Sequence, residues 1–194
     1  MHKPHILHVC TGRAQPLQAE GGTLQSGIRK TAIAGPVAAS ALGLQGDGQA
    51  DLSVHGGQSK AIYAYPAEHL PFWQTVRAQA GVQPWGEALP PGLLGENLLL
   101  QGLLETDLWV GDRLVLPDFV LTVSGPRFPC FKFTAIMGFK QAAKMMVESD
   151  FCGSYLAVLV PGAVQAGDAI ELQPGPREVN IRALFLRRVR PRRG

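Results

Sequence analysis

The chain has 194 residues, 46% hydrophobic and 17% charged, which fits one globular domain and excludes a disordered or low-complexity protein. No apolar run reaches the roughly 20 residues that a membrane helix needs, so no membrane span is expected. The net charge of +3 is unevenly spread, because residues 177–194 hold seven of the 18 basic residues, all arginines, and one of the 15 acidic ones. The rest of the chain, with 11 basic and 14 acidic residues, is therefore acidic overall.

Short apolar segments follow one another with turn residues between them, and their length and β-branched content predict strands. In chain order they are Ile6–Val9, Ile28–Ile33, Ala61–Tyr65, Leu98–Leu100, Arg113–Leu116, Val120–Val123, Tyr155–Val160 and Ala169–Leu172. So many strands without regularly alternating helices predict a barrel or a sandwich.

Two helices are expected among these strands. One follows Pro66, with Leu70, Trp73 and Val76 at helical spacing, and the other runs from about Phe139 to Glu148. Between them, segment 81–95 is rich in proline and glycine and predicts a long irregular loop.

The C-terminal residues are expected to form a last strand, Val179 to Leu186, and a solvated basic end. This divides the chain into a β-rich domain, residues 1–176, and a last strand with a basic tail, residues 177–194. The arginines could also contact nucleic acid or anionic lipid, but the solvated end is the favoured interpretation and nucleic acid is not an expected partner.

The cysteines indicate a reducing compartment. There are three, at positions 10, 130 and 152, and their odd number and wide spacing argue against a disulfide framework. Together with the missing apolar signal segment, this predicts a cytoplasmic protein. His2, His5 and His8 are spaced three apart, but at a chain end, where solvated side chains are a better interpretation than a metal site.

Two glycine-marked segments are candidate site segments, and the first could bind an anion. In residues 54–62, Gly56 and Gly57 allow a close backbone approach, and His55 and Lys60 supply polar groups. The second segment, 95–98, contains Glu96 and Asn97. Each segment taken alone is also explained by a turn or a strand cap.

Cys130 lies in Val-Ser-Gly-Pro-Arg-Phe-Pro-Cys-Phe-Lys-Phe, residues 123–133. Arg127 and Lys132 would lower the pKa of its thiol if they point the same way, and in an extended chain residues 130 and 132 share a face. The alternative is an inert buried thiol, which is the usual state of a free cysteine.

Taken together and in this order, seven segments resemble a MOSC domain, named for the C-terminal domain of molybdenum cofactor sulfurases. They are most similar to its stand-alone YiiM-like branch. The segments are residues 42–51, 55–57, 60–69, 95–97, 108–112, 123–132 and 164–168. One position differs from the family pattern, because Ser59 stands where an acidic residue is common.

The resemblance implies a mainly β fold, a MOSC-type closed β-barrel with a few short helices. It also implies a bound molybdenum cofactor, a molybdopterin, with Cys130 as the catalytic residue and molybdenum ligand, as suits a soft thiolate. No pyridoxal phosphate is expected. The groups expected around the cofactor are His55, Gly56, Gly57, Lys60, Asn97, Arg127 and Lys132.

Two functions remain open at this point. The first is a reductase of N-hydroxylated small molecules or bases, supplied with electrons by a separate donor protein because the sequence holds no flavin or iron–sulfur motif. The second is a sulfur-carrier or cofactor-handling protein that carries a persulfide on Cys130. Both use the same cysteine, so the sequence does not separate them.

Overall fold

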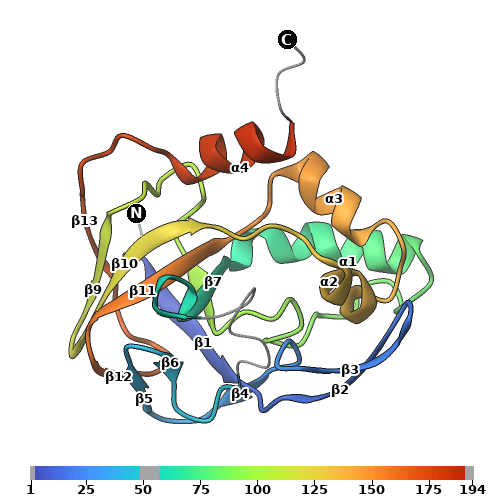
Figure 1. Ribbon diagram of the computed structural model, residues 1–194, viewed down its shortest axis with the longest axis horizontal. Helices are drawn as coiled ribbons and strands as arrows, with labels where there is room; N and C mark the ends of the chain where they lie inside the picture. The colour runs from blue at the N-terminus through green and yellow to red at the C-terminus, as the bar shows by residue number, and fades with distance from the viewer. Residues whose placement is uncertain (1–2, 49–56, 191–194) are drawn as a thin grey trace.

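An eight-stranded curved sheet organises the molecule, as shown by the computed structural model, which describes residues 3–48 and 57–190 (Figure 1). The strands of this sheet are β1 (His5–Thr11), β4 (Thr31–Ile33), β7 (Ile62–Pro66), β8 (Leu98–Gln101), β9 (Arg113–Leu116), β10 (Phe119–Pro126), β11 (Ser154–Val160) and β13 (Glu171–Gln173). Smaller sheets contain β2 (Gln15–Ala19) with β3 (Gly22–Ser26), and β5 (Val37–Ser40) with β6 (Gly43–Leu44) and β12 (Gly162–Val164).

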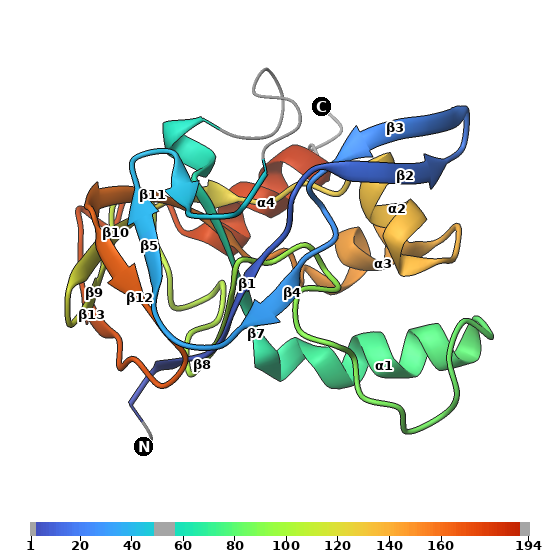
Figure 2. The same cartoon turned by 90° about the horizontal axis from the view of Figure 1, so that it is seen from below.

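The helices gather at one end of the sheet. They are α1 (Leu70–Gln79), α2 (Phe131–Met137), α3 (Ala142–Ser149) and α4 (Ile181–Val189), with short 3₁₀ turns η1 (Gln58–Lys60) and η2 (Ala67–His69). Figure 2 shows the β2–β3 hairpin extending from the body beside α2. No helix within residues 3–48 and 57–190 is long and apolar enough to cross a membrane.

The mainly β fold is confirmed, but the closed barrel is not: the sheet is an open half-barrel. Its strand order is β13-β9-β10-β11-β7-β8-β1-β4, and the edge strands β13 and β4 do not pair in the part described. The start of β1 reaches the segment before β13 through the hydrogen bonds Ile6 N–H to Asp168 O (2.9 Å) and Ile170 N–H to Pro4 O (2.7 Å). This contact is one isolated bridge rather than a ladder, because β12 pairs with β5 in the separate three-stranded sheet.

Two helices replace predicted extended chain. The expected strand Val179–Leu186 is wrong: α4 begins at Ile181, capped by Asn180, whose Oδ1 accepts a hydrogen bond from Ala183 N–H (3.2 Å). Ile181 and Phe185, one helical turn apart, are its buried residues. Apolar side chains four residues apart favour a helix, and here that spacing outweighs the β-branched content.

The second replacement is α2, which directly follows Cys130. The prolines at 126 and 129 suggested an extended chain through Lys132, but helical backbone begins at Phe131 and ends at Gly138, in the left-handed conformation (φ 80°) that suits a glycine cap. Residues 130 and 132 therefore do not share a strand face.

The core fills the concave side of the sheet and the underside of the helices. Trp73 of α1 is fully buried, donates from Nε1 to the Tyr65 hydroxyl of β7 (2.6 Å), and meets Phe133 of α2 edge to face. The predicted helix after Pro66 is thus confirmed as α1, and residues 81–95 form an irregular connection, as expected.

Asn97 joins three segments at the base of this core. Its Oδ1 accepts from Tyr63 N–H (3.1 Å), and its Nδ2 donates to Cys10 O (3.2 Å) and to Asp47 Oδ2 (2.9 Å). Asp47 also forms an ion pair with Lys30. The side chain that the sequence suggested for cofactor binding is therefore buried, with its hydrogen-bonding groups used inside the protein.

We predict that Asn97→Ala lowers the free energy of unfolding by about 2–4 kcal/mol, because it leaves buried groups of Tyr63, Cys10 and Asp47 without partners. Urea unfolding followed by circular dichroism measures the change. Gln101→Ala, on an exposed side chain at the end of β8, is the control and should change stability by less than about 0.5 kcal/mol. Equal losses in both variants would contradict the role given to Asn97.

Candidate functional site

Cys130 lies at the turn between β10 and α2 and is half-buried. Its backbone is extended (φ −138°, ψ 171°), and its carbonyl accepts hydrogen bonds from Phe133 N–H (3.0 Å) and Thr134 N–H (3.2 Å). The carbonyl therefore caps the first turn of α2, and the thiol stays at the edge of the fold, where it is partly exposed.

Arg127 lies beneath this turn, with only 5% of its surface exposed. Its guanidinium lies 4.6 Å from the Tyr63 ring centre and 5.0 Å from that of Phe133, and its Nη1 donates to Leu94 O. Burial alone lowers the pKa of Arg127, but neighbouring Tyr63, Tyr155 and Cys130 raise it above its usual value. The side chain thus provides a permanent positive charge under the cysteine turn.

Lys132 is the second basic residue of this turn and lies in α2. It is only 8% exposed, yet its side chain has no ion pair or hydrogen bond with the described residues. A buried cation is costly unless it is paired. The Lys132 ammonium is not among the buried atoms that lack a hydrogen bond, so it reaches solvent at the start of α2 and is accessible to an anionic ligand.

Tyr155 of β11 connects the glycine-marked segment to the cysteine turn. Lys60, at the end of η1, lies 5.8 Å from the Tyr155 ring centre, and the Tyr63 ring lies 5.5 Å away. Burial raises the pKa of Tyr155, Arg127 lowers it, and Cys130 raises it further. Sequence reasoning missed this residue, since a tyrosine in a regular strand carries no motif.

The segment 57–60 therefore lies against β10 and β11, the strands next to the Arg127–Cys130 turn. Ser124 of β10 supports this contact, because its hydroxyl donates to Ser59 O. Gly57 has φ 78°, a conformation that favours glycine. His55 and Gly56 lie outside the described residues.

Glu96 has one oxygen without a partner. Its Oε1 accepts from Gly92 N–H (2.6 Å), but Oε2 is buried with no hydrogen bond. Burial raises the pKa of Glu96 from 4.5 to about 7, although the Gly92 N–H and Arg127 act in the opposite direction. This carboxyl is therefore partly protonated near neutral pH.

The other two cysteines differ from Cys130. Cys10 and Cys152 are fully buried, and burial raises the pKa of Cys10 to about 12 and that of Cys152 well above its usual value. Thiols that keep their proton are poor nucleophiles and poor metal ligands.

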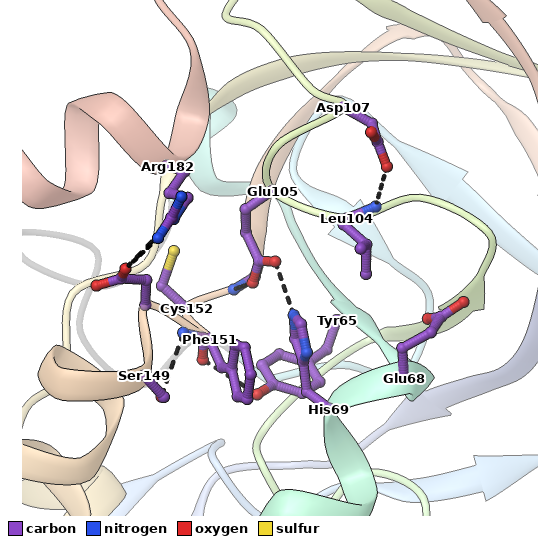
Figure 3. Close-up of polar contacts among 12 residues, drawn as sticks. Tyr65, Glu68, His69, Leu104, Glu105, Asp107, Ser149, Phe151, Cys152 and Arg182 are labelled. Atoms are coloured by element: carbon purple, nitrogen blue, oxygen red, sulfur yellow. Dashed lines mark hydrogen bonds and ion pairs between the residues drawn. The ribbon is translucent and has the colours of Figure 1, made fainter.

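A pocket of about 170 Å³ lies under α4 and is lined in part by His69, Glu105 and Arg182 (Figure 3). His69 Nε2 donates to Glu105 Oε2 (2.8 Å), Glu105 Oε1 accepts from Gly153 N–H (2.7 Å), and Phe151 stacks on the imidazole with ring centres 3.8 Å apart. No sequence motif indicated this pair. Tyr63 Oη donates to Cys152 O (2.9 Å), so segment 151–153 is held from both sides. Through the bond to Gly153, the His69–Glu105 pair supports the start of β11, the strand that carries Tyr155.

No group of three or more histidine, cysteine or acidic side chains that could hold a metal ion occurs within residues 3–48 and 57–190. A metal at Cys130 would therefore have one protein thiolate and would need its other ligands from a cofactor.

The sequence model of the MOSC domain family matches residues 51–171. The chain belongs to the MOSC domain family. This MOSC protein is 32% identical to Protein YiiM of Escherichia coli over 178 residues, which cover 90% of this chain and 75% of YiiM. The crystal structure of YiiM from Geobacillus stearothermophilus superposes with a TM-score of 0.76 at 27% identity, covering 98% of this chain and 86% of that one. The YiiM-like resemblance is thus confirmed.

A third relative is larger. A protein of Gibberella moniliformis named "Reductase" is 36% identical over 172 residues, which are 88% of this chain but 29% of that protein. Most of that protein therefore lies outside the part that resembles this MOSC protein.

We predict that Cys130 is the thiol that reacts first with a maleimide at neutral pH, because it alone is partly exposed. Mass spectrometry of peptides after brief labelling measures the order. Cys130→Ser should abolish fast labelling, while Cys10 and Cys152 should react only after unfolding. Fast labelling of Cys152 in the wild type would contradict this assignment.

A second prediction concerns Glu96. Because its pKa is raised in the folded state, the folded protein binds the proton more tightly, and stability falls as pH rises from about 4.5 to about 7. Glu96→Gln should remove this loss, so its stability relative to wild type should increase by about 3 kcal/mol between acid pH and pH above 7. Urea unfolding across this range tests it, with Glu87→Gln, an exposed carboxyl, as control. If the free energies of unfolding of wild type and Glu96→Gln changed in parallel with pH, the prediction would be wrong.

Proposed function

We propose that this MOSC protein binds the molybdenum cofactor through Cys130 and reduces N-hydroxylated small molecules, such as hydroxylamino bases. The observation that carries the proposal is a half-buried thiol in a turn that lies over a fixed positive charge, Arg127, and leads into α2, where Lys132 makes no ion pair with the described residues. A soft thiolate suits molybdenum, and the single protein ligand fits a cofactor that brings its own donors. When bound, the molybdenum centre would supply the removal of oxygen from the substrate.

The basic groups near the turn support binding of the cofactor's phosphate. Lys132 offers an ammonium that makes no ion pair with the described residues, and Lys60 and the Gly57 backbone lie at η1. Arg127 is enclosed by two rings and a carbonyl, so we assign it a different role. It holds the turn and keeps the surroundings of Cys130 electropositive.

The reaction consumes protons as well as electrons. Conversion of R–NHOH to R–NH₂ and water takes two electrons and two protons. We assign proton donation to the Tyr155 hydroxyl, which lies close enough to Arg127 and Cys130 for both to influence its pKa.

The electrons must come from a separate donor protein. The relative named "Reductase" supports reductive chemistry for the family and contains a large part beyond the MOSC match. Cys10, Cys130 and Cys152 form no disulfide, which fits the reducing cytoplasm proposed as the location.

We predict that protein purified from a host with an intact molybdenum cofactor pathway contains molybdenum, and that Cys130→Ser loses most of it. Metal analysis of matched preparations measures this, and Cys152→Ala is the control that removes a thiol away from the turn. With a chemical reductant, wild type should reduce a hydroxylamino base and Cys130→Ser should not.

Lys132→Ala should retain the ligand but weaken cofactor retention. Loss of a charge-assisted hydrogen bond costs about 1.5–3 kcal/mol, or roughly 10- to 150-fold in affinity. Dialysis followed by metal analysis measures the loss. If wild type takes up no molybdenum but accepts persulfide sulfur on Cys130, the sulfur-carrier function replaces the proposed one.

A further inference from the structure

The arginines of the C-terminal segment divide into two sets, and the first is structural. Arg182 and Arg190 both pair with Asp150, at 3.0 Å and 3.3 Å, and Arg177 pairs with Asp112 at 3.6 Å. Arg190 also donates to carbonyls at the end of α3. These three arginines have acidic partners, so they anchor α4 and the segment before it.

The second set is Arg187 and Arg188, near the end of α4. Both are exposed, and neither has an acidic partner within the described residues. The Arg188 guanidinium lies 4.9 Å from the ring centre of Phe128, which in turn stacks on Phe185 with ring centres 5.6 Å apart. Phe128 belongs to the Arg127–Cys130 turn, so the basic end of α4 packs directly on the loop that carries the thiol.

A second aromatic ring of the same turn is exposed to solvent. Phe131, which directly follows Cys130, is 55% exposed, whereas the aromatic side chain two residues later, Phe133, is fully buried. We call Arg187, Arg188, Phe128 and Phe131 the docking face. It combines uncompensated positive charge with exposed apolar surface next to the thiol, the composition typical of a protein contact.

We propose that the docking face receives a small acidic electron-carrier protein, which supplies the two electrons of substrate reduction. This inference rests on the proposed function. In balanced form, R–NHOH, two protons and two one-electron reduced carriers give R–NH₂, water and two oxidised carriers. An acidic partner is favoured because the remainder of the chain is itself acidic, so positive charge is concentrated at this end.

The size of the face argues for a transient protein contact rather than nucleic acid. Among residues 3–48 and 57–190 the face offers two arginines without an acidic partner, fewer than the about 6–10 phosphate contacts of a strongly salt-dependent DNA-binding protein. Brief redox encounters use small interfaces steered by charge, for which two arginines and an aromatic ring suffice.

The test measures binding of a purified acidic ferredoxin, and of an acidic flavodoxin as a second carrier, to the full-length protein. Arg187→Glu should lower the association rate about tenfold or more at low salt, and the difference should shrink at high salt because salt screens the charges. Arg113→Glu makes the same charge change on an exposed residue of β9, outside the docking face, and should bind like wild type. Phe131→Ser should speed dissociation.

Binding does not need the metal, so its outcome is independent of the molybdenum test. Carrier-driven turnover should fall in Arg187→Glu, while turnover with a chemical reductant should not. The proposal is overturned if wild type binds neither carrier at low salt, or if Arg187→Glu and Arg113→Glu bind equally. Binding of transfer RNA or of phosphatidylserine vesicles that depends on Arg187, without carrier binding, would also overturn it and assign the face to that ligand.

Discussion

The buried guanidinium of Arg127 is the interaction on which the site depends. A charge removed from water must be compensated, and here the compensation comes from two aromatic faces and the Leu94 carbonyl. These partners come from β7, α2 and the irregular loop before β8, which are distant in sequence. Because one side chain bonds to all three, the cysteine turn has a defined position relative to the sheet.

The polar groups around Arg127 form two sets with different roles. Asn97, Asp47 and Lys30 satisfy one another below it and join β1, β7 and the start of β8. Their pairing makes them structural. The thiol of Cys130 is partly exposed, and Lys132 makes no ion pair within residues 3–48 and 57–190. This contrast between the two sets is the physical reason for assigning ligand binding to Lys132 and Cys130.

The position of α4 follows from the open edge of the sheet, because the chain leaves the sheet at the edge strand β13 before it forms this helix. The half-barrel leaves β13 as a short edge strand, and the chain beyond it crosses back over β10 to reach the cysteine turn. Figure 1 shows α4 lying across this end of the molecule next to α3. The anchoring pairs to Asp150 and Asp112 hold the C-terminal segment there, and so bring its remaining basic charge beside Phe128.

Local sequence patterns were sufficient for much of the fold. The strands around Ile6–Val9, Arg113–Leu116 and Tyr155–Val160, the helix after Pro66 and the irregular loop were all predicted from short-range alternation, spacing and turn residues. The β2–β3 hairpin was missed, since its short strands carry mixed polar residues. The strand proposed at 179–186 failed because a residue's β-propensity is weaker than the burial of Ile181 and Phe185 on one helical face.

The sequence by itself determined the family, the cysteine and the basic residues near it, because these depend on residue identity and order. Only the tertiary structure decided what each basic residue does. Arg127 and Lys132 look equivalent in sequence, five residues apart, yet Arg127 is enclosed by rings and a carbonyl while Lys132 pairs with none of the residues that the structure describes. Likewise Asn97 is structural and Tyr155 belongs to the site. The reason is that pairing and burial are set by segments far apart in the chain, which no local pattern records.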